Sequence, residues 1–462
     1  MKRLSKIQFA MLSAFVTVSS FMASCSSDIQ EVTGQQQSEK LPSVTYAVSI
    51  SSTMDDDGSL TRALATEGSG EGESLVATWG NETVHVYAGD EKVGTLTPLT
   101  TGGASTTLNG TLTKEGGFAV NDELTLYYLK DKNAQGVYSG QLGTIADIAA
   151  NYDYATATVT VTQAGPSTVF GNDNILKTSA ASFTKSQAVV KLLPGFKNAA
   201  LSVTSLTITS TNLAGSPLTV TPAAATNTLY FVLHNTASGA QDYTFDAVAG
   251  GQTYTYSASR TFADATFTHP TSLMNMKKKA ENLTIDAIAD QTYTNADIKP
   301  EPVVRDGSYT LVKGTDYNST ISYSNNRNVG QATVTITTMG DNYTGTKSQT
   351  FNIVKATPTI TFTGDLETNN YGIIDLRTAT NTLSIGASAN LGATIASYTS
   401  SDTSVATVSS TGVVTGLSGG TTTITVRTTE TANLNVQTRT LTVYVKEGIG
   451  GGLNAPGVGQ NW

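Results

Sequence analysis

Residues 412–426 read GVVTGLSGGTTTITV, and this stretch decides the fold class of the segment around it. Apolar residues alternate with threonine in its second half, which is typical of a strand with one buried face. Gly412 and Gly416 stand where tight turns are expected. The residues expected to face inward are Val405, Val413, Ile424 and Val426, followed in the last strand by Leu441, Val443 and Val445. The pattern predicts antiparallel β structure.

Two short motifs precede this stretch, Tyr398-Thr399-Ser400-Ser401-Asp402 and Val405-Ala406-Thr407-Val408. Together with residues 412–426 they resemble the bacterial Ig-like group 2 domain. The resemblance implies an Ig-like sandwich over residues 356–446. Residues 447–462 form a glycine-rich tail that ends in Asn461-Trp462.

The segment before it, residues 280–355, carries strand patterns separated by Asn, Gly and Asp turn residues. Asn325, Asn326 and Gly330 can all adopt positive φ. Motifs such as Gly314-Thr315-Asp316-Tyr317 and residues 329–334 resemble a bacterial Ig-like repeat of long surface proteins. A second Ig-like module is therefore expected here.

Residues 44–279 also read as antiparallel β structure, because short alternating runs recur between turn residues. Val44, Tyr46, Val48 and Ile50 form the buried face of an expected first strand, and Phe183 to Leu193 reads as one long strand. Only Ile145 to Ala150 favours a helix. We expect two sandwiches, at residues 44–165 and 166–279, so the fold class is all-β with tandem antiparallel β-sandwiches.

Within this half, four features resemble the fimbrillin-like family, the subunits of Bacteroidales-type surface fimbriae. They are the first strand, Thr61-Arg62-Ala63, Trp79 ahead of Val84-His85-Val86-Tyr87, and Asn121-Asp122-Glu123-Leu124 ahead of Tyr127-Tyr128. The resemblance implies two transthyretin-like domains, export as a lipoprotein, and cleavage after an arginine by a trypsin-like protease. Arg62 matches that position, with Ala63 as the new N-terminus. Cleavage would free the first strand for replacement by a neighbour's donor strand.

The N-terminus has the layout of a secretory signal peptide, with Lys2, Arg3 and Lys6 ahead of an apolar run from Phe9 to Phe21. Met22-Ala23-Ser24-Cys25 resembles a bacterial lipobox, and Cys25 is the only cysteine of the chain. We expect residues 1–24 to be removed, Cys25 to be acylated, and residues 25–43 to act as a lipid tether. An incidental cysteine beside an ordinary cleavage site is the alternative.

The composition excludes several classes of function. The chain has a formal net charge of −9, and its one basic cluster, Lys277-Lys278-Lys279, is expected to be a solvated strand end or linker, so no nucleic-acid partner is predicted. Gly416 to Gly420 fits G-x-S-x-G but lacks the strand-turn-helix context of a nucleophile. The histidines at 85, 234 and 269 lack metal-binding spacing. We predict no catalytic residue, cofactor or metal, and therefore no enzyme.

Two functions remain open. The first is a fimbrial protein of the outer membrane and cell surface, lipid-anchored, with other fimbrial subunits as partners and a role in adhesion to a host or bacterial surface protein or glycan. Because Ig-like modules follow the fimbrillin-like half, a tip, accessory or anchor subunit is favoured over a shaft subunit. The second is a glycan-binding surface lipoprotein with Ig-like spacers. Exposed aromatic residues would favour it, but Trp79 and Trp462 are the only tryptophans, and Tyr152 and Tyr154 fit a core equally well.

Overall fold

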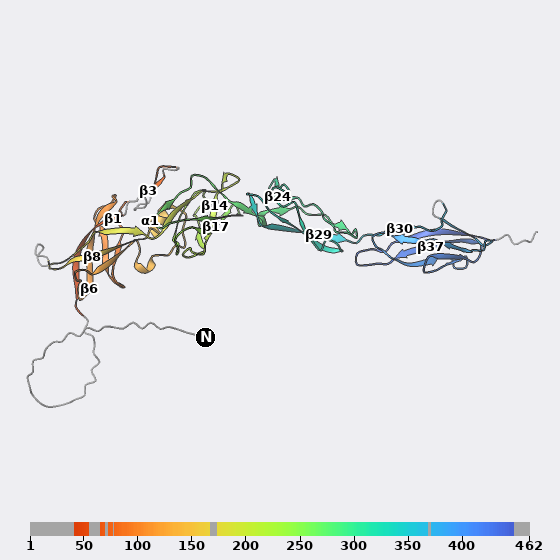
Figure 1. Cartoon of the computed structure of the whole chain (residues 1–462), viewed down its shortest axis with the longest axis horizontal. Coiled ribbons are helices and arrows are strands. Elements are labelled where there is room, and N and C mark those ends of the chain that lie inside the picture. Colours follow the sequence, from red (N-terminus) through yellow and green to blue (C-terminus); the bar gives the residue numbers. More distant parts are fainter. Residues whose placement is uncertain are drawn as a thin grey trace, which may run out of the picture.

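The computed structural model describes residues 41–54, 65–69, 73–76, 78–166, 173–367 and 371–447. Strands are the main regular element among these residues, with a single α-helix beside them, which confirms the expected all-β class and tandem β-sandwiches. The strands form four successive regions along one elongated molecule, with β1 towards one end and β37 towards the other (Figure 1). Whether each region folds on its own stays a prediction.

The first region is a sheet whose two edges meet. Its order is β10-β1-β6-β5-β4-β7-β8-β9, and the further pairings β1–β9 and β8–β10 close it around a core that includes Leu96, Leu112 and Leu126. Because β9 and β10 complete this sheet, the expected boundary at residue 165 falls inside it. The elements are β1 (Ser43–Met54), β4 (Val84–Ala88), β5 (Glu91–Pro98), β6 (Ser105–Glu115), β7 (Glu123–Tyr128), η2 (Lys132–Ala134), β8 (Ala155–Pro166), β9 (Asn174–Thr178) and β10 (Ala181–Lys185).

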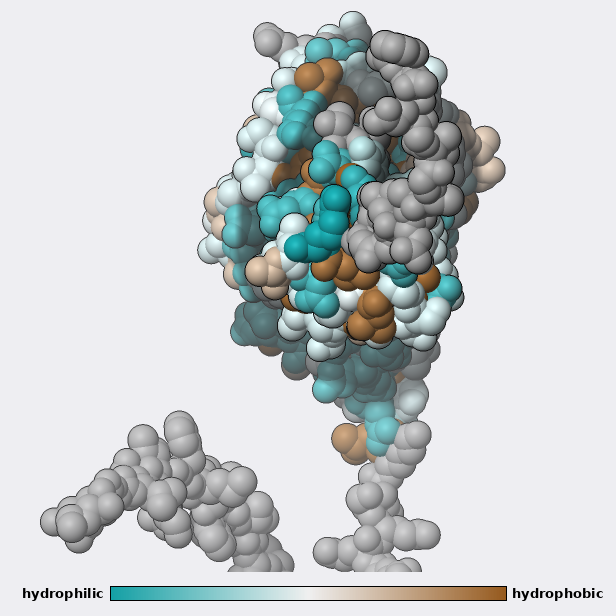
Figure 2. Space-filling model, turned by 90° about the vertical axis from the view of Figure 1, so that its right-hand side faces the viewer, coloured by the Kyte–Doolittle hydropathy of each residue, from teal (hydrophilic) through white to brown (hydrophobic). Residues whose placement is uncertain are grey.

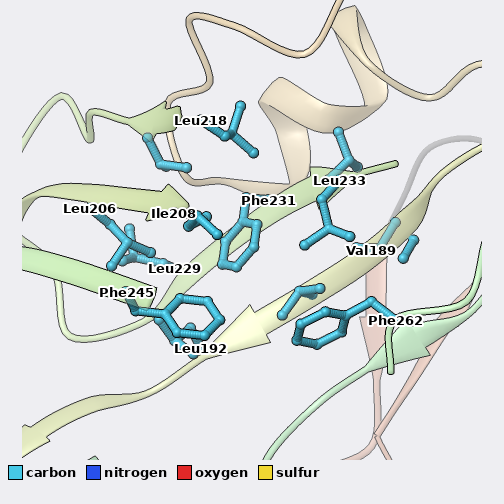
Figure 3. Close-up of a cluster of buried hydrophobic side chains, with 14 of the residues drawn as sticks. Val189, Leu192, Leu206, Ile208, Leu218, Leu229, Phe231, Leu233, Phe245 and Phe262 are labelled. Carbon is cyan, nitrogen blue, oxygen red and sulfur yellow. The ribbon is translucent and has the colours of Figure 1, made fainter. Parts of the chain in front are cut away.

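The second region packs two groups of strands around the core shown in Figure 3, which includes Ile208, Phe231 and Phe245. The helix α1 (Ile145–Asn151) packs on this core, since Ile148 is fully buried in it. Its strands are β2 (Ala65–Glu67), β3 (Ser74–Val76), β11 (Ala188–Leu192), β12 (Pro194–Phe196), β13 (Ala199–Ala200), β14 (Val203–Thr209), β15 (Leu218–Val220), β16 (Leu229–Leu233), β17 (Gln241–Ala249), β18 (Gln252–Arg260), β19 (Phe267–Thr268), β20 (Met274–Asn275) and β21 (Lys277–Lys279).

The third region shares a sheet with the second, because β28 pairs in parallel with β21. It has two small cores, one around Tyr343 and one around Phe351. Asn325 has φ 55°, as its turn position predicts, and Gly330, the first residue of β27, has φ 137°. The elements are η3 (Ala280–Asn282), β22 (Thr284–Ile285), β23 (Gln291–Thr292), β24 (Val304–Asp306), β25 (Tyr309–Thr310), β26 (Ser322–Ser324), β27 (Gly330–Thr337), β28 (Tyr343–Thr344) and β29 (Thr346–Val354).

The fourth region has a core that includes Ile374, Ile424 and Val443. Seen from this end, hydrophobic residues lie interspersed with hydrophilic ones on the surface (Figure 2). The strands are β30 (Ile360–Phe362), β31 (Tyr371–Asp375), β32 (Thr382–Ser384), β33 (Ala387–Ala389), β34 (Ile395–Ser400), β35 (Ala406–Val408), β36 (Val413–Gly416), β37 (Gly420–Thr428) and β38 (Thr438–Lys446).

Two expectations at single residues are wrong. Val414, not Val413, points into the core of the fourth region, because the alternation along β36 is shifted by one residue. Gly416 ends β36 directly before the bend at Ser418 and Gly419, as expected, and a Cβ there would stand 2.9 Å from Ile374. Lys278 is buried, since its ammonium pairs with Asp306 across the second and third regions.

The run from Phe183 to Leu193 is also not one strand. It divides into β10, which belongs to the first sheet, and β11, which belongs to the second region. The chain therefore passes from one region to the next at Ser186 and Gln187. Buried side chains continue through this crossing, which explains why the sequence reads as a single strand.

Candidate strand-exchange site

The first strand, β1, closes the sheet of the first region, and its two edges are held very unequally. Along one edge it pairs antiparallel with β6 from Ser43 to Thr53. Along the other edge it pairs in parallel with β9 only at Ala47 and Val48, and with β10 from Ser52 to Met54. Removal of β1 would open the sheet between β6 and the pair β9 and β10.

The side chains of β1 alternate as the sequence predicts. Tyr46, Val48, Ile50 and Ser52 are buried, and the residues between them are exposed. Ser52 Oγ donates a hydrogen bond to the Thr106 carbonyl at 3.0 Å, which satisfies a hydroxyl that is only 1% exposed. The strand therefore presents three apolar groups and one satisfied polar group to the core.

The Tyr46 ring fills a pocket made by residues 117 and 118. Its centroid lies 5.3 Å from that of Phe118 in an edge-to-face arrangement, and the Phe118 amide donates to the Tyr46 hydroxyl at 3.4 Å. Gly117 has φ 77°, and a Cβ there would stand 2.7 Å from the hydroxyl oxygen. Glycine is thus needed both for the backbone conformation and for the space that the ring occupies. The doublet Gly116-Gly117 before an aromatic residue is the sequence signal for this pocket.

A cavity lies along the weaker edge of β1. It has a volume of about 550 Å³ and is lined by Ala47, Val48 and Ser49 of β1 and by Asp173, Ile175, Leu176 and Lys177 at β9. The cavity thus follows the edge of β1 that has the fewer backbone pairings.

The segment that follows β1 is anchored in a different region. Leu75 of β3 lies in the core of the second region and is 3% exposed. The carboxylate of Glu73 accepts from Lys191 at 2.5 Å and from the Tyr230 hydroxyl at 3.2 Å. Burial alone would lower the pKa of Lys191, but the hydrogen bond to Glu73 and the nearby Tyr230 raise its pKa overall. β1 and β3 are thus held by separate cores.

The predicted processing position lies between these two anchors. Arg62 and Ala63, like Cys25, the signal peptide at residues 1–24 and the tail beyond residue 447, lie outside the described residues. The described chain stops at Met54 and resumes at Ala65. The sequence did not indicate that β1 and β3, which flank this position, would be anchored in two different regions. The Glu73–Lys191 pair that anchors β3 joins residues far apart in the chain, so no local pattern marks it.

The other candidate residues do not form a second site together. Trp79 is 1% exposed and packs edge-to-face on Phe183 at 5.8 Å, and Tyr152 and Tyr154 are also core residues. Among the described residues, no group of histidine, cysteine or acidic side chains could hold a metal ion. His234 Nδ1 contacts Asp264 at 2.9 Å. His85 lies in β4 of the first region, and His269 directly follows β19. Ser418 sits between β36 and β37, where its hydroxyl donates to the Ser404 carbonyl at 2.8 Å.

In the part of the chain that the structure describes, no helix has the length and hydrophobicity needed to cross a bilayer.

Comparison with known proteins identifies one segment. Residues 383–443 match the bacterial Ig-like domain (group 2), in agreement with the resemblance seen in the sequence. This match covers the strands from β32 onward and does not extend to the first three regions. No curated protein matches the chain.

Solved structures provide only distant similarities. The surface-layer protein SbsC is 14% identical, with a TM-score of 0.18 and coverage of 87% of this chain and 54% of its own. Invasin, a bacterial integrin-binding protein, is 12% identical, with a TM-score of 0.15 and coverage of 87% and 79%. Drosophila N-cadherin EC1-4 is 11% identical, with a TM-score of 0.19 and coverage of 86% and 98%. This chain spans about half of the SbsC structure, and no functional argument rests on such TM-scores.

Proposed function

We propose that this protein is a non-enzymatic, lipid-anchored subunit of a cell-surface fimbria, with a tip, accessory or anchor position and a role in adhesion. The Ig-like match at residues 383–443 supports an extracellular scaffold rather than a shaft subunit alone. The position of β1 supports assembly by strand exchange, and it is the observation that carries the proposal. Cys25 would hold the uncleaved precursor at the outer membrane, and the lipid-bearing fragment would leave with β1 once processing and strand exchange are complete.

In this proposal a trypsin-like protease cuts after Arg62, so that Ala63 becomes the new N-terminus. The cut leaves β1 attached to the first region only by its strand pairing and by the burial of Tyr46, Val48 and Ile50. Each such side chain contributes roughly 1.5–3 kcal/mol, which is enough to retain β1 for a time but can be matched by an equivalent strand. The segment from Glu73 onward stays on the second region through its own core.

The incoming strand would come from another fimbrial subunit and take the direction of β1. It would then pair with β6 on one side and with β9 and β10 on the other, which restores the closed sheet and leaves no open edge. Burial of Trp79 argues against the glycan-binding alternative at that residue, since a buried indole cannot stack on a sugar.

The experiment is to purify sheared surface filaments and to sequence the N-terminus of this protein by mass spectrometry. Ala63 at the N-terminus in wild type, together with loss of Arg62→Ala from filaments, is the expected result. Arg327→Ala, which removes an exposed arginine of the third region, is the matched control and should enter filaments normally. A wild-type filament protein that begins at Cys25, or normal incorporation of Arg62→Ala, would overturn the mechanism.

A further inference from the structure

A separate cavity opens in the second region, on the side of β11 that faces β17 and β18. Its volume is about 360 Å³. Leu192, Phe245 and Phe262, which form part of its lining, lie close to β11 in Figure 3. Val190 and Met274 add further apolar surface to the wall. The interior therefore suits an apolar group the size of one ring or a short chain.

The cavity exists because β11 is covered unevenly. β16 pairs with β11 over its whole length from Ala188 to Leu192. On the opposite edge of β11, β19 pairs only with Val189 and Val190. The next pairing on this side is that of β20 with Pro194 and Gly195 of β12. Residues 269–273 bridge these two short pairings, and His269, Pro270, Ser272 and Leu273 of this bridge line the cavity.

The lining includes a cationic side chain whose charge is not neutralised by a neighbour. Arg260, at the end of β18, donates from Nη2 to the Tyr256 hydroxyl at 2.9 Å and from Nη1 to the Ser259 carbonyl at 3.3 Å. Both of these acceptors are neutral. Within the described ranges, the Arg260 guanidinium forms no ion pair with a carboxylate. Lys191, which also lines the cavity, is already paired with Glu73.

His269 also lines the cavity, where its ring stacks on Phe267 with ring centroids 5.0 Å apart. Its Nδ1 is buried with no hydrogen-bond partner among the described residues, but that atom has almost no accessible surface and so does not face the open cavity. The exposed Arg260 guanidinium is therefore the group of the lining that a ligand's negative charge can reach.

We propose that this cavity binds a small organic carboxylate whose body is apolar. The carboxylate would accept from the Arg260 guanidinium, and the apolar body would lie against Leu192, Phe245 and Phe262. A carboxylate brings two acceptor oxygens and a negative charge to the guanidinium, which a neutral group cannot do. A neutral sugar fits poorly, because its hydroxyls would face the apolar wall without partners.

The test uses the purified full chain and 3-phenylpropanoate as the probe, with 3-phenylpropan-1-ol as the uncharged counterpart. Titration calorimetry should show saturable binding of the acid, and at least ten-fold weaker binding of the alcohol. Arg260→Gln should weaken binding of the acid at least ten-fold, whereas Arg327→Gln, an exposed arginine in the third region, should leave it unchanged.

A second variant fills the space. Thr268→Trp places an indole at the cavity wall and should abolish binding, and its thermal melting would be compared with wild type to verify folding. In wild type, the acid should shift the ¹⁵N resonances of the His269 ring. The proposal is overturned if the acid does not bind saturably, if the alcohol binds equally well, or if a folded Thr268→Trp chain still binds the acid.

Discussion

Lys197 Nζ donates a hydrogen bond to the Tyr343 hydroxyl at 2.7 Å, which joins the second region to the third. The Tyr343 hydroxyl in turn donates to Asp306 Oδ2 at 3.1 Å, and Lys197 lies over the Tyr309 ring at 4.1 Å. Burial and then the charge of Asp306 hold the pKa of Tyr343 far above its usual range. Together with the β21–β28 pairing, this network makes the junction one packed unit.

Tyr343→Phe should therefore destabilise the second and third regions together. Loss of the hydroxyl removes the hydrogen bonds that it makes with Lys197 and with Asp306 Oδ2, while Asp306 Oδ1 keeps its pair with Lys278, and we expect a cost of about 1–3 kcal/mol in the free energy of unfolding. Urea unfolding would measure it, with Tyr371→Phe in the fourth region as the control. Combining Tyr343→Phe with Lys197→Met should cost less than the sum of the single changes. Strict additivity would mean that the two side chains do not act together.

Gly117→Ala should loosen β1. The new Cβ would stand 2.7 Å from the Tyr46 hydroxyl oxygen, and φ 77° adds backbone strain. Gly136→Ala is a close control, because Gly136 has the same φ of 77° with nothing within 4 Å. We expect Gly117→Ala to cost about 1 kcal/mol more than the control and to speed hydrogen exchange in β1. This difference in the free energy of unfolding should become smaller in a Tyr46→Phe background, which lacks the hydroxyl. An unchanged difference there would show that the Tyr46 hydroxyl is not what the new Cβ meets.

Cys25→Ser should abolish lipid attachment, because acylation needs the thiol of the residue after the signal peptide. Cells fed a labelled fatty acid should label the wild-type protein and leave the variant unlabelled, and the variant should leave the membrane fraction. Ser24→Thr, a neighbouring change that keeps the thiol, serves as the control for expression. Undiminished labelling of Cys25→Ser would rule out this anchor.

The second region should lose stability at alkaline pH. Burial raises the pKa of Tyr138 to about 12 and that of Tyr154 to about 12, and the two rings pack edge-to-face at 5.7 Å. Below pH ~10 both tyrosines are neutral whether the chain is folded or unfolded, so their contribution is fully present. Above pH ~10 only the unfolded chain releases the protons, so stability falls until the folded pKa of about 12 is passed.

Absorbance of tyrosinate during a pH titration checks this expectation. Tyr138→Phe and Tyr154→Phe should each remove a component that titrates near pH 12. The double variant should show a shallower loss of stability between pH ~10 and 12 than wild type. If both rings ionise near pH ~10 in the folded chain, the assignment of their burial is incorrect.

Local alternation predicted much of the secondary structure. The buried face of β1 at Tyr46, Val48 and Ile50 and the helix α1 both follow from spacing within a few residues. The same reasoning misplaced Val413, because Val413 and Val414 are equally apolar and only the pairing of β36 selects which one faces inward. Pattern also could not separate β10 from β11, since the chain changes sheets at Ser186 and Gln187 without a glycine, proline or asparagine to mark a turn.

The sequence by itself determined the all-β class, the inward-facing positions of β1, β37 and β38, and the Ig-like character of residues 383–443. Only the tertiary structure decided that β1 closes the first sheet in parallel with β9 and β10, and that Glu73 and Lys278 are buried against Lys191 and Asp306. The physical reason is range. Alternation is a local property of the backbone, whereas the partner of a strand edge or of a buried charge can lie a hundred residues away and leaves no mark on its neighbours in sequence.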